Sequence, residues 1–279
     1  MNKPGNAAKD GPLGSFAAAG RAEDEKSLIR IGGIRGHGKD NIEGGRSRDG
    51  VSYSDVQEKN WNFFHGRAVP GALSQKMTRI VIATHNSHKT GEFRALLGPG
   101  WKVEDLTQHP DLPIPVEDGD TFEANARIKA VSAGQRLGPE VLVVADDSGL
   151  EVDALAGRPG IYSARYAGPG EGDAGNRVKV LQEMSAVEEG DRSARFRCVL
   201  ALARGGQVVA SFSGSLEGRL SREAMGGGGF GYDPIFIPQG HELTFGELPS
   251  DVKNGLSHRA RALVGLLKWI EDAELTYHH

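Results

Sequence analysis

The sequence has little that would suggest a membrane protein, a disulfide framework or a nucleic-acid surface. Its 279 residues contain one cysteine, Cys198, which excludes an intrachain disulfide and a cysteine cluster for a metal. There is no run of about 18 apolar residues and no apolar segment typical of a signal peptide. Lys and Arg number 33 against 37 Asp and Glu, without a long basic run. We therefore expect a cytoplasmic protein that engages neither membrane nor nucleic acid.

Residues 1–77 lack the regular apolar spacing of a helix or a strand and are rich in Gly, Asp, Arg and Ser. We expect a disordered extension here, and Met77 as the natural start of the protein. The segment Gly33–Asp40 nearly matches a phosphate-binding P-loop. It ends in Asp40, where a hydroxyl is needed for Mg²⁺, and no amphipathic helix follows, so we disfavour it.

From residue 78 the pattern becomes regular and alternates between strands and helices. A buried strand over 79–84 is followed by a helix over 87–97, a strand near 102–106, a helix over 121–137 and a strand over 141–145. A helix over 175–186, β segments over 194–203 and 207–220, a strand over 234–237 and a helix over 257–270 complete the series. Arg204-Gly205-Gly206 is typical of a hairpin turn. This order predicts a mixed α/β domain over 78–273, followed by a short tail over 274–279.

The segment Thr84-His85-Asn86-Ser87-His88-Lys89 joins a buried strand to the start of a helix. Free backbone N–H groups and the helix dipole favour an anion there, and Asn86 and Lys89 add side-chain donors. An ordinary turn capped by Asn86 or Ser87 is an equally good interpretation of this segment alone.

Two adjacent carboxylates, Asp146 and Asp147, follow an apolar strand and precede Ser148 and Gly149. Buried carboxylates need a cation or hydrogen bonds, and Mg²⁺ prefers carboxylate oxygen. The alternative is an Asp that caps a turn before Gly149. Because neighbouring strand residues point to opposite faces, we expect one functional and one structural Asp.

Four further groups are ambiguous by themselves. The acidic turn with Glu117, taken alone, favours a solvated loop with Thr121 as a helix cap, and Lys129 is equally a surface lysine. The Gly-rich loop that leads to Phe230-Gly231-Tyr232-Asp233 offers an aromatic face and a carboxylate suited to a purine base. Ser257-His258-Arg259 supplies hydrogen-bond donors at the start of the last helix, or simply caps it.

In order, THNSHK, EDGDTFxxNA, ADDSGL, PGIYSARYAG, GGFGYDPIF and KxxxSHR resemble the motifs of the noncanonical purine nucleoside triphosphate pyrophosphatases, also called inosine/xanthosine triphosphatases or the Ham1-like family. The resemblance covers 78–270. It implies an elongated α/β fold with a mixed β-sheet flanked by helices, two lobes enclosing a nucleotide cleft, and a homodimer. It also implies hydrolysis of inosine, deoxyinosine and xanthosine triphosphates to the monophosphate and pyrophosphate.

The resemblance also assigns roles to residues. Glu117 and Asp147 would serve a Mg²⁺ site, and Asp147 would be the catalytic proton acceptor. The remaining residues would bind the substrate. The triphosphate would be held by Thr84, His85, Asn86, Ser87, His88 and Lys89, and Ser148 would make a further substrate contact. Phosphate or base would be contacted by Lys129 and Lys253, and the base by Phe230, Gly231, Tyr232, Asp233, His258 and Arg259. Many members carry Gly where this chain has His85.

Three rival functions remain. A related Maf-type pyrophosphatase that prefers other bases is disfavoured by the SHR and FGYDP motifs. A catalytically silent nucleotide-binding protein would be expected to lack an essential carboxylate or lysine, and none is lost. A P-loop phosphotransferase would depend on Gly33–Asp40.

Overall fold

The structure, a computed structural model, describes residues 78–276, with side chains up to residue 273. The predicted extension over 1–77, the P-loop-like segment and the proposed start at Met77 lie outside the described residues. The strands are β1 (Thr78–Ile82), β2 (Trp101–Asp105), β3 (Leu142–Val152), β4 (Ser193–Arg204), β5 (Gln207–Leu220) and β6 (Phe236–Pro238). The α-helices are α2 (Ser87–Leu97), α3 (Phe122–Leu137), α4 (Gly172–Glu183), α5 (Ser250–Leu256) and α6 (His258–Thr276). Short 3₁₀ helices cover Leu106–Gln108, Asp153–Leu155, Gly160–Arg165, Glu189–Asp191 and Asp233–Ile235.

The six strands form one mixed sheet in the order β2-β1-β3-β4-β5-β6. Strand β1 is parallel to β2 and β3, whereas the β3–β4, β4–β5 and β5–β6 pairs are antiparallel. The β4–β5 hairpin turns at Gly205 and Gly206, whose φ angles of 57° and 78° suit glycine. The predicted mixed α/β fold and the predicted hairpin are therefore confirmed.

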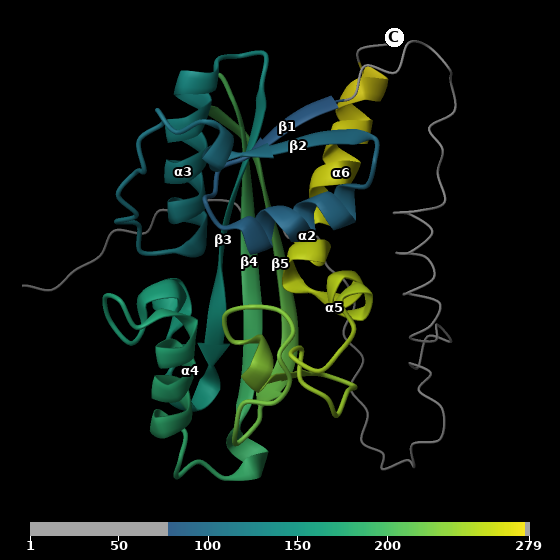
Figure 1. Cartoon of the computed structure of the whole chain (residues 1–279). Coiled ribbons are helices and arrows are strands. Elements are labelled where there is room, and N and C mark those ends of the chain that lie inside the picture. The colour runs from purple at the N-terminus through teal and green to yellow at the C-terminus, as the bar shows by residue number, and fades with distance from the viewer. Residues whose placement is uncertain (1–77, 277–279) are drawn as a thin grey trace, which may run out of the picture. The chain divides into compact units, whose positions relative to one another are not determined.

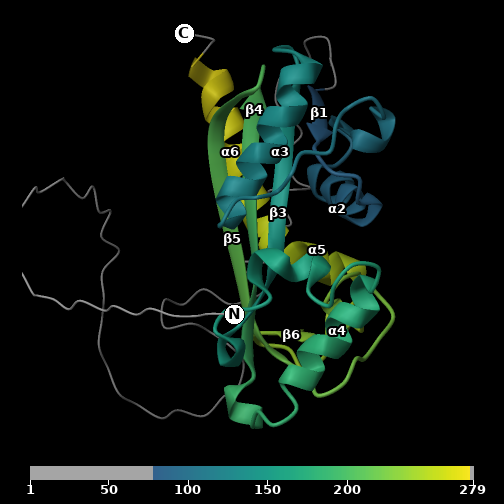
Figure 2. The ribbon, with the colours of Figure 1, turned by 90° about the vertical axis from the view of Figure 1, so that its left-hand side faces the viewer.

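Alternation along the strands divides the core between the two faces of the sheet (Figures 1 and 2). On one face, Ile82, Val144 and Leu200 pack with α2 and α6. On the other, Val81, Val143 and Ala201 pack with α3, whose Phe122, Ala126, Ala130 and Ala133 form the predicted buried stripe. A third apolar cluster lies where α4, β6 and the far ends of β3, β4 and β5 meet. No helix within 78–276 is long and apolar enough to cross a membrane.

Several boundaries differ from the prediction. The strand predicted over 79–84 is β1, which ends at Ile82, and the strand predicted over 234–237 is the shorter β6, which follows a 3₁₀ helix over Asp233–Ile235. Strand β3 does not end before Asp146 but runs through to Val152, because antiparallel pairing with β4 continues along its whole length. Helix α4 begins at Gly172 and α6 extends to Thr276. Helix α5 was missed, because its seven residues are too few to show a helical period.

Candidate active site

A cavity of about 230 Å³ collects many of the predicted site residues. Its walls come from the turn before α2, from α3, from the middle of β3 and from the segment around Gly160–Arg165. The predicted residues that line it are Thr84, His85, Asn86, Lys89, Glu117, Lys129, Asp147 and Ser148, together with Asp146. Residues from four separate parts of the chain therefore meet at one place.

The turn before α2 is both a capped helix start and a possible anion site. The Asn86 Oδ1 atom accepts hydrogen bonds from the backbone amides of His88 at 2.9 Å and Lys89 at 3.3 Å. This confirms Asn86 as the helix cap. The backbone N–H groups of His85 and Ser87 have no acceptor within residues 78–276, so they are the donors left for a ligand.

Lys129 joins the two carboxylates predicted to serve a metal. Its Nζ atom lies 2.6 Å from Asp147 Oδ1 and 3.1 Å from Glu117 Oε2. Burial opposes ionisation of Lys129, but the Asp147 carboxylate outweighs it and raises the pKa of the lysine. Burial also raises the pKa of Asp147, against the opposing effect of Lys129. The second oxygen of Asp147, Oδ2, is buried and has no hydrogen-bond partner among the described residues 78–276.

Asp146 points to the opposite face of β3, as the alternation predicts. Its carboxylate accepts from Lys89 Nζ at 2.5 Å, Ser148 Oγ at 2.8 Å and Arg259 Nε at 2.8 Å. Burial would raise the pKa of Asp146, but Arg259 and Lys89 hold it well below its usual range. Cys198 is buried and its thiol also donates to Asp146.

A row of buried charges continues from Asp146 towards the Gly-rich loop. The Arg259 guanidinium also contacts Glu92, and Glu92 Oε1 accepts from Lys253 Nζ at 2.7 Å. Lys253 in turn lies 2.5 Å from Asp233 Oδ2. Residues that are far apart in sequence thus form one row: Lys89, Asp146, Arg259, Glu92, Lys253 and Asp233.

The Phe230 ring lies at the end of this row. Lys253 Nζ is 4.7 Å from its centroid, and the His88 ring stacks on it with a centroid distance of 5.4 Å. The Phe230 amide donates to Asp233 Oδ2 at 2.7 Å, which fixes the loop next to the charged row. A part-exposed aromatic face is therefore held beside the first turn of α2.

Some predicted residues contribute to the surroundings and not to the cavity wall. Tyr232 is buried, and its hydroxyl donates to the Ser163 carbonyl at 2.8 Å. His258 is buried against Phe196 at a ring distance of 4.8 Å, and burial lowers its pKa to about 3. Neither lines the 230 Å³ cavity. The other predicted site residues outside its lining are Ser87, His88, Phe230, Gly231, Asp233, Lys253 and Arg259.

The sequence interpretation missed two charged residues. Glu92 lies on the buried side of α2 beside Phe93, and a carboxylate at such a position is a recognisable sign of a buried ion pair. Arg165 lines the cavity, and its guanidinium contacts only the Tyr162 ring, at 5.3 Å, within the described residues. It lies inside the PGIYSARYAG motif, where only its charge could have suggested a role.

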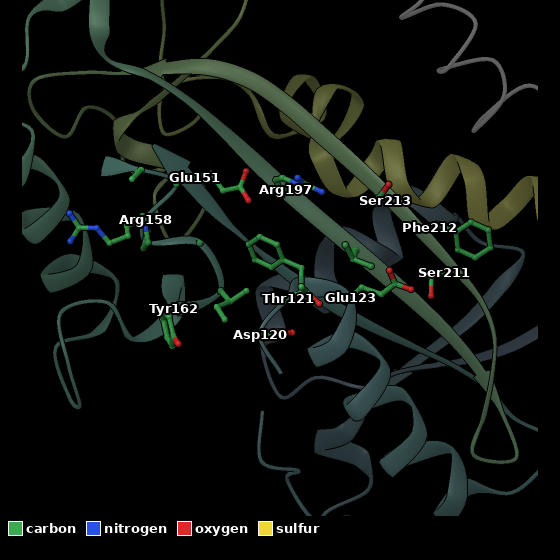
Figure 3. A pocket seen from close by; sticks show the side chains of 17 residues that line it. Asp120, Thr121, Glu123, Glu151, Arg158, Tyr162, Arg197, Ser211, Phe212 and Ser213 are labelled. Atoms are coloured by element: carbon green, nitrogen blue, oxygen red, sulfur yellow. The ribbon is translucent and has the colours of Figure 1, made fainter. Parts of the chain in front are cut away.

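A larger cavity of about 900 Å³ lies elsewhere, between the start of α3, the segment 156–162 and strands β4 and β5 (Figure 3). Arg197, Glu151 and Ser213 come from the sheet, whereas Arg158 and Tyr162 come from the segment opposite. None of the predicted site residues lines it. We therefore place the candidate active site in the smaller cavity, where the cations and carboxylates converge.

Comparison with known proteins identifies the family. A model of the Ham1 family matches residues 80–269. A dITP/XTP pyrophosphatase of Shouchella clausii is 47% identical over 195 residues, which cover 70% of this chain and 98% of that protein. The dITP/XTP pyrophosphatase of Bacillus subtilis is 45% identical over 196 residues, with the same coverage of 70% and 98%.

Solved structures give the same result. The Ham1 protein of Staphylococcus aureus matches with a TM-score of 0.62 and 37% identity, covering 70% of this chain and 100% of that one. A HAM1 protein from Coxiella burnetii matches with a TM-score of 0.63 and 40% identity, at the same coverage of 70% and 100%. Sequence and fold agree, and the chain belongs to the Ham1 family.

Proposed function

We propose that this protein hydrolyses noncanonical purine nucleoside triphosphates, namely those of inosine, deoxyinosine and xanthosine, to the nucleoside monophosphate and pyrophosphate. The observation that supports this best is the convergence of the turn before α2, Lys129 and the Glu117–Asp147 carboxylates in one cavity. Relatives 45–47% identical to the chain are named dITP/XTP pyrophosphatases. The reaction removes damaged nucleotides from the pool used for nucleic-acid synthesis.

Glu117 and Asp147 are the proposed ligands of Mg²⁺. They fit a hard cation because both already contact one ammonium group, and because Asp147 Oδ2 is a buried oxygen without a partner. Within residues 78–276 no group of three His, Cys, Asp or Glu side chains gathers, so phosphate oxygens and water would complete the coordination. When bound, Mg²⁺ neutralises phosphate charge and acidifies a water molecule.

The side chains and backbone of the protein bind the phosphates and accept the proton. The free N–H groups of His85 and Ser87 and the Lys89 ammonium face the phosphates. The carboxylate of Asp147 is also the proposed acceptor of the proton of the attacking water. A bond forms between the water oxygen and the α-phosphorus while the bond to the pyrophosphate oxygen breaks. The raised pKa of Asp147 makes it a stronger base than an ordinary Asp.

Phe230 is the proposed stacking surface for the purine, and the pair His258–Arg259 is the proposed determinant of a 6-keto base. A donor directed at O6 would meet the amino group of adenine and remain unpaired, which disfavours ATP. The part-exposed ring of Phe230, held between Lys253 and His88, supports the stacking role.

Several further features are proposed from the family resemblance: a homodimer, a cytoplasmic location and a catalytic domain over 78–273. Light scattering of the purified protein tests the dimer. A truncation that starts at Met77 tests the domain boundary, because it should retain full activity. Loss of activity in this truncation would instead favour the P-loop segment Gly33–Asp40.

A panel of nucleoside triphosphates tests the function directly. With Mg²⁺, the triphosphates of inosine, deoxyinosine and xanthosine should be cleaved far faster than ATP or GTP, and pyrophosphate should be the only phosphorus product besides the monophosphate. Release of orthophosphate, or a preference for ATP, would contradict the proposal. A preference for other modified bases would favour the Maf-type alternative.

A further inference from the structure

Helix α4 holds the loop that carries Phe230 through a pair of hydrogen bonds to one residue. The Gly231 N–H donates to Asp173 Oδ2 at 2.8 Å, and Arg177 Nη1 donates to the Gly231 carbonyl at 2.7 Å. Asp173 and Arg177 are four residues apart, so they project from the same side of the helix. Both backbone polar groups of Gly231 are thus satisfied by one helix that is 54 to 58 residues away in sequence.

Asp173 lies in the first turn of α4, where a carboxylate also suits the helix dipole. Within residues 78–276, Asp173 makes no ion pair within 4.0 Å, and neither does Arg177. Gly231 has a φ of 59°, and an added Cβ would meet nothing within 4 Å. Packing around its α-carbon does not restrain Gly231, so its hydrogen bonds to α4 act together with the turn that the Asp233 amide closes on the Phe230 carbonyl.

The same helix also holds the segment that forms another wall of the cavity. Asn176 Oδ1 accepts from the Ala167 amide at 2.7 Å, and Asn176 Nδ2 donates to the Ala164 carbonyl at 3.2 Å. Ala164 and Arg165 line the 230 Å³ cavity. One helix thus connects the cavity wall at 161–165 with the aromatic loop at 230–231.

We propose that Asp173 and Arg177 are positioning residues that set the Phe230 ring for the purine base, although neither touches the base itself. This rests on the proposed function, because it assumes that the Phe230 ring receives a base. Without the two hydrogen bonds the loop samples other conformations, and each binding event must then order it again. The cost falls on substrate binding and not on the chemical step at Asp147.

The kinetic test uses Asp173→Ala and Arg177→Met, with Asp173→Asn and Arg177→Lys as conservative partners. A hydrogen bond of about 1–1.5 kcal/mol corresponds to roughly a tenfold rise in KM for deoxyinosine triphosphate. We expect that rise in both disruptive variants, with kcat within about twofold of the unmodified enzyme. Asp173→Asn should retain a low KM, because the Asn Oδ1 still accepts from the Gly231 N–H, and Arg177→Lys should be intermediate. Arg136→Met removes an exposed cation elsewhere and should change neither constant.

An unchanged KM in both disruptive variants would overturn the proposal, as would a fall in kcat that matches the rise in KM. It would also fail if Asp173→Asn were as impaired as Asp173→Ala. Amide hydrogen exchange of the peptide covering 226–233 provides a readout that does not need activity. Faster exchange of this peptide in Arg177→Met, with the exchange of α4 unchanged, supports the positioning role of Asp173 and Arg177. This result holds even if the unmodified protein proves inactive on deoxyinosine triphosphate. Unchanged exchange of this peptide overturns that role.

Discussion

Adjacent carboxylates on β3 should respond in opposite ways to the same chemical change. Asp146→Asn and Asp147→Asn each replace one carboxylate with an amide of the same shape. Both line the cavity, but Asp146 contacts Lys89 and Arg259 in the buried row of charges, whereas Asp147 contacts Lys129. We expect the first change to reduce mainly stability, and the second mainly activity.

The magnitudes follow from the contacts. In Asp146→Asn the amide no longer balances two buried cations, and breaking a buried ion pair costs about 3–5 kcal/mol. For a domain of about 200 residues, this corresponds to a fall of roughly 6–20 °C in the unfolding midpoint. In Asp147→Asn the amide oxygen still accepts from Lys129, which keeps its ion pair with Glu117. Burial raises the pKa of Asp147, so removing its charge also removes a desolvation cost, and the loss of stability should be smaller than in Asp146→Asn.

Activity should fall mainly in Asp147→Asn, the variant that keeps most of its stability. Loss of the proton acceptor predicts a fall of about 10²–10⁴-fold in kcat for Asp147→Asn. Urea denaturation followed by circular dichroism measures the stability, and release of pyrophosphate from deoxyinosine triphosphate measures kcat. Equal losses of stability in the two variants would refute the division of roles. Near-normal turnover by Asp147→Asn would refute its assignment as the base.

Three other changes test separate parts of the site. Gly149→Ala would bring a Cβ into steric conflict with the Gly160 carbonyl oxygen and Ser163 Oγ. Urea denaturation should therefore show a loss of about 1–3 kcal/mol or more in the free energy of unfolding, and an unchanged midpoint would contradict this close packing. Arg165 lines the cavity, and Arg165→Met should raise KM for the triphosphate about tenfold or more, because the Arg165 guanidinium would no longer contact a phosphate. An equal rise in KM in Arg136→Met would indicate only a general effect of lost positive charge. The pKa of His258 is lowered to about 3, so the unfolded chain binds an extra proton once the pH falls below about 6.5. Stability should therefore fall by about 2 kcal/mol between pH 6.5 and pH 5 through this group, and His258→Gln should flatten that part of the pH profile in urea titrations.

Local patterns were sufficient to predict much of the fold. Helix α2 was predicted at its observed bounds because a strand, a capping Asn86 and an apolar period occur in immediate succession. Strand β5 and its hairpin were predicted because Gly205-Gly206 separates two β segments. These signals depend on neighbouring residues only, so the sequence displays them directly.

The end of β3 was predicted wrongly because the reason for its continuation is remote in sequence. Two carboxylates after an apolar run resemble the end of a strand, since a buried charge without a partner is costly. The partners of Asp146 are Lys89 and Arg259, which lie 57 and 113 residues away. Only the folded arrangement shows that this strand can continue with its carboxylates inside.

The buried charges also limit how the substrate can be recognised. Lys89, Lys129, Lys253 and Arg259 are each paired with one or two carboxylates of the protein. These side chains can donate hydrogen bonds to a triphosphate, but carboxylates of the protein already balance most of their positive charge before the triphosphate binds. Among the cations that line the cavity within residues 78–276, Arg165 is the one without a carboxylate partner. We therefore propose that the charge of the triphosphate is met chiefly by Arg165, by the start of α2 and by the proposed Mg²⁺.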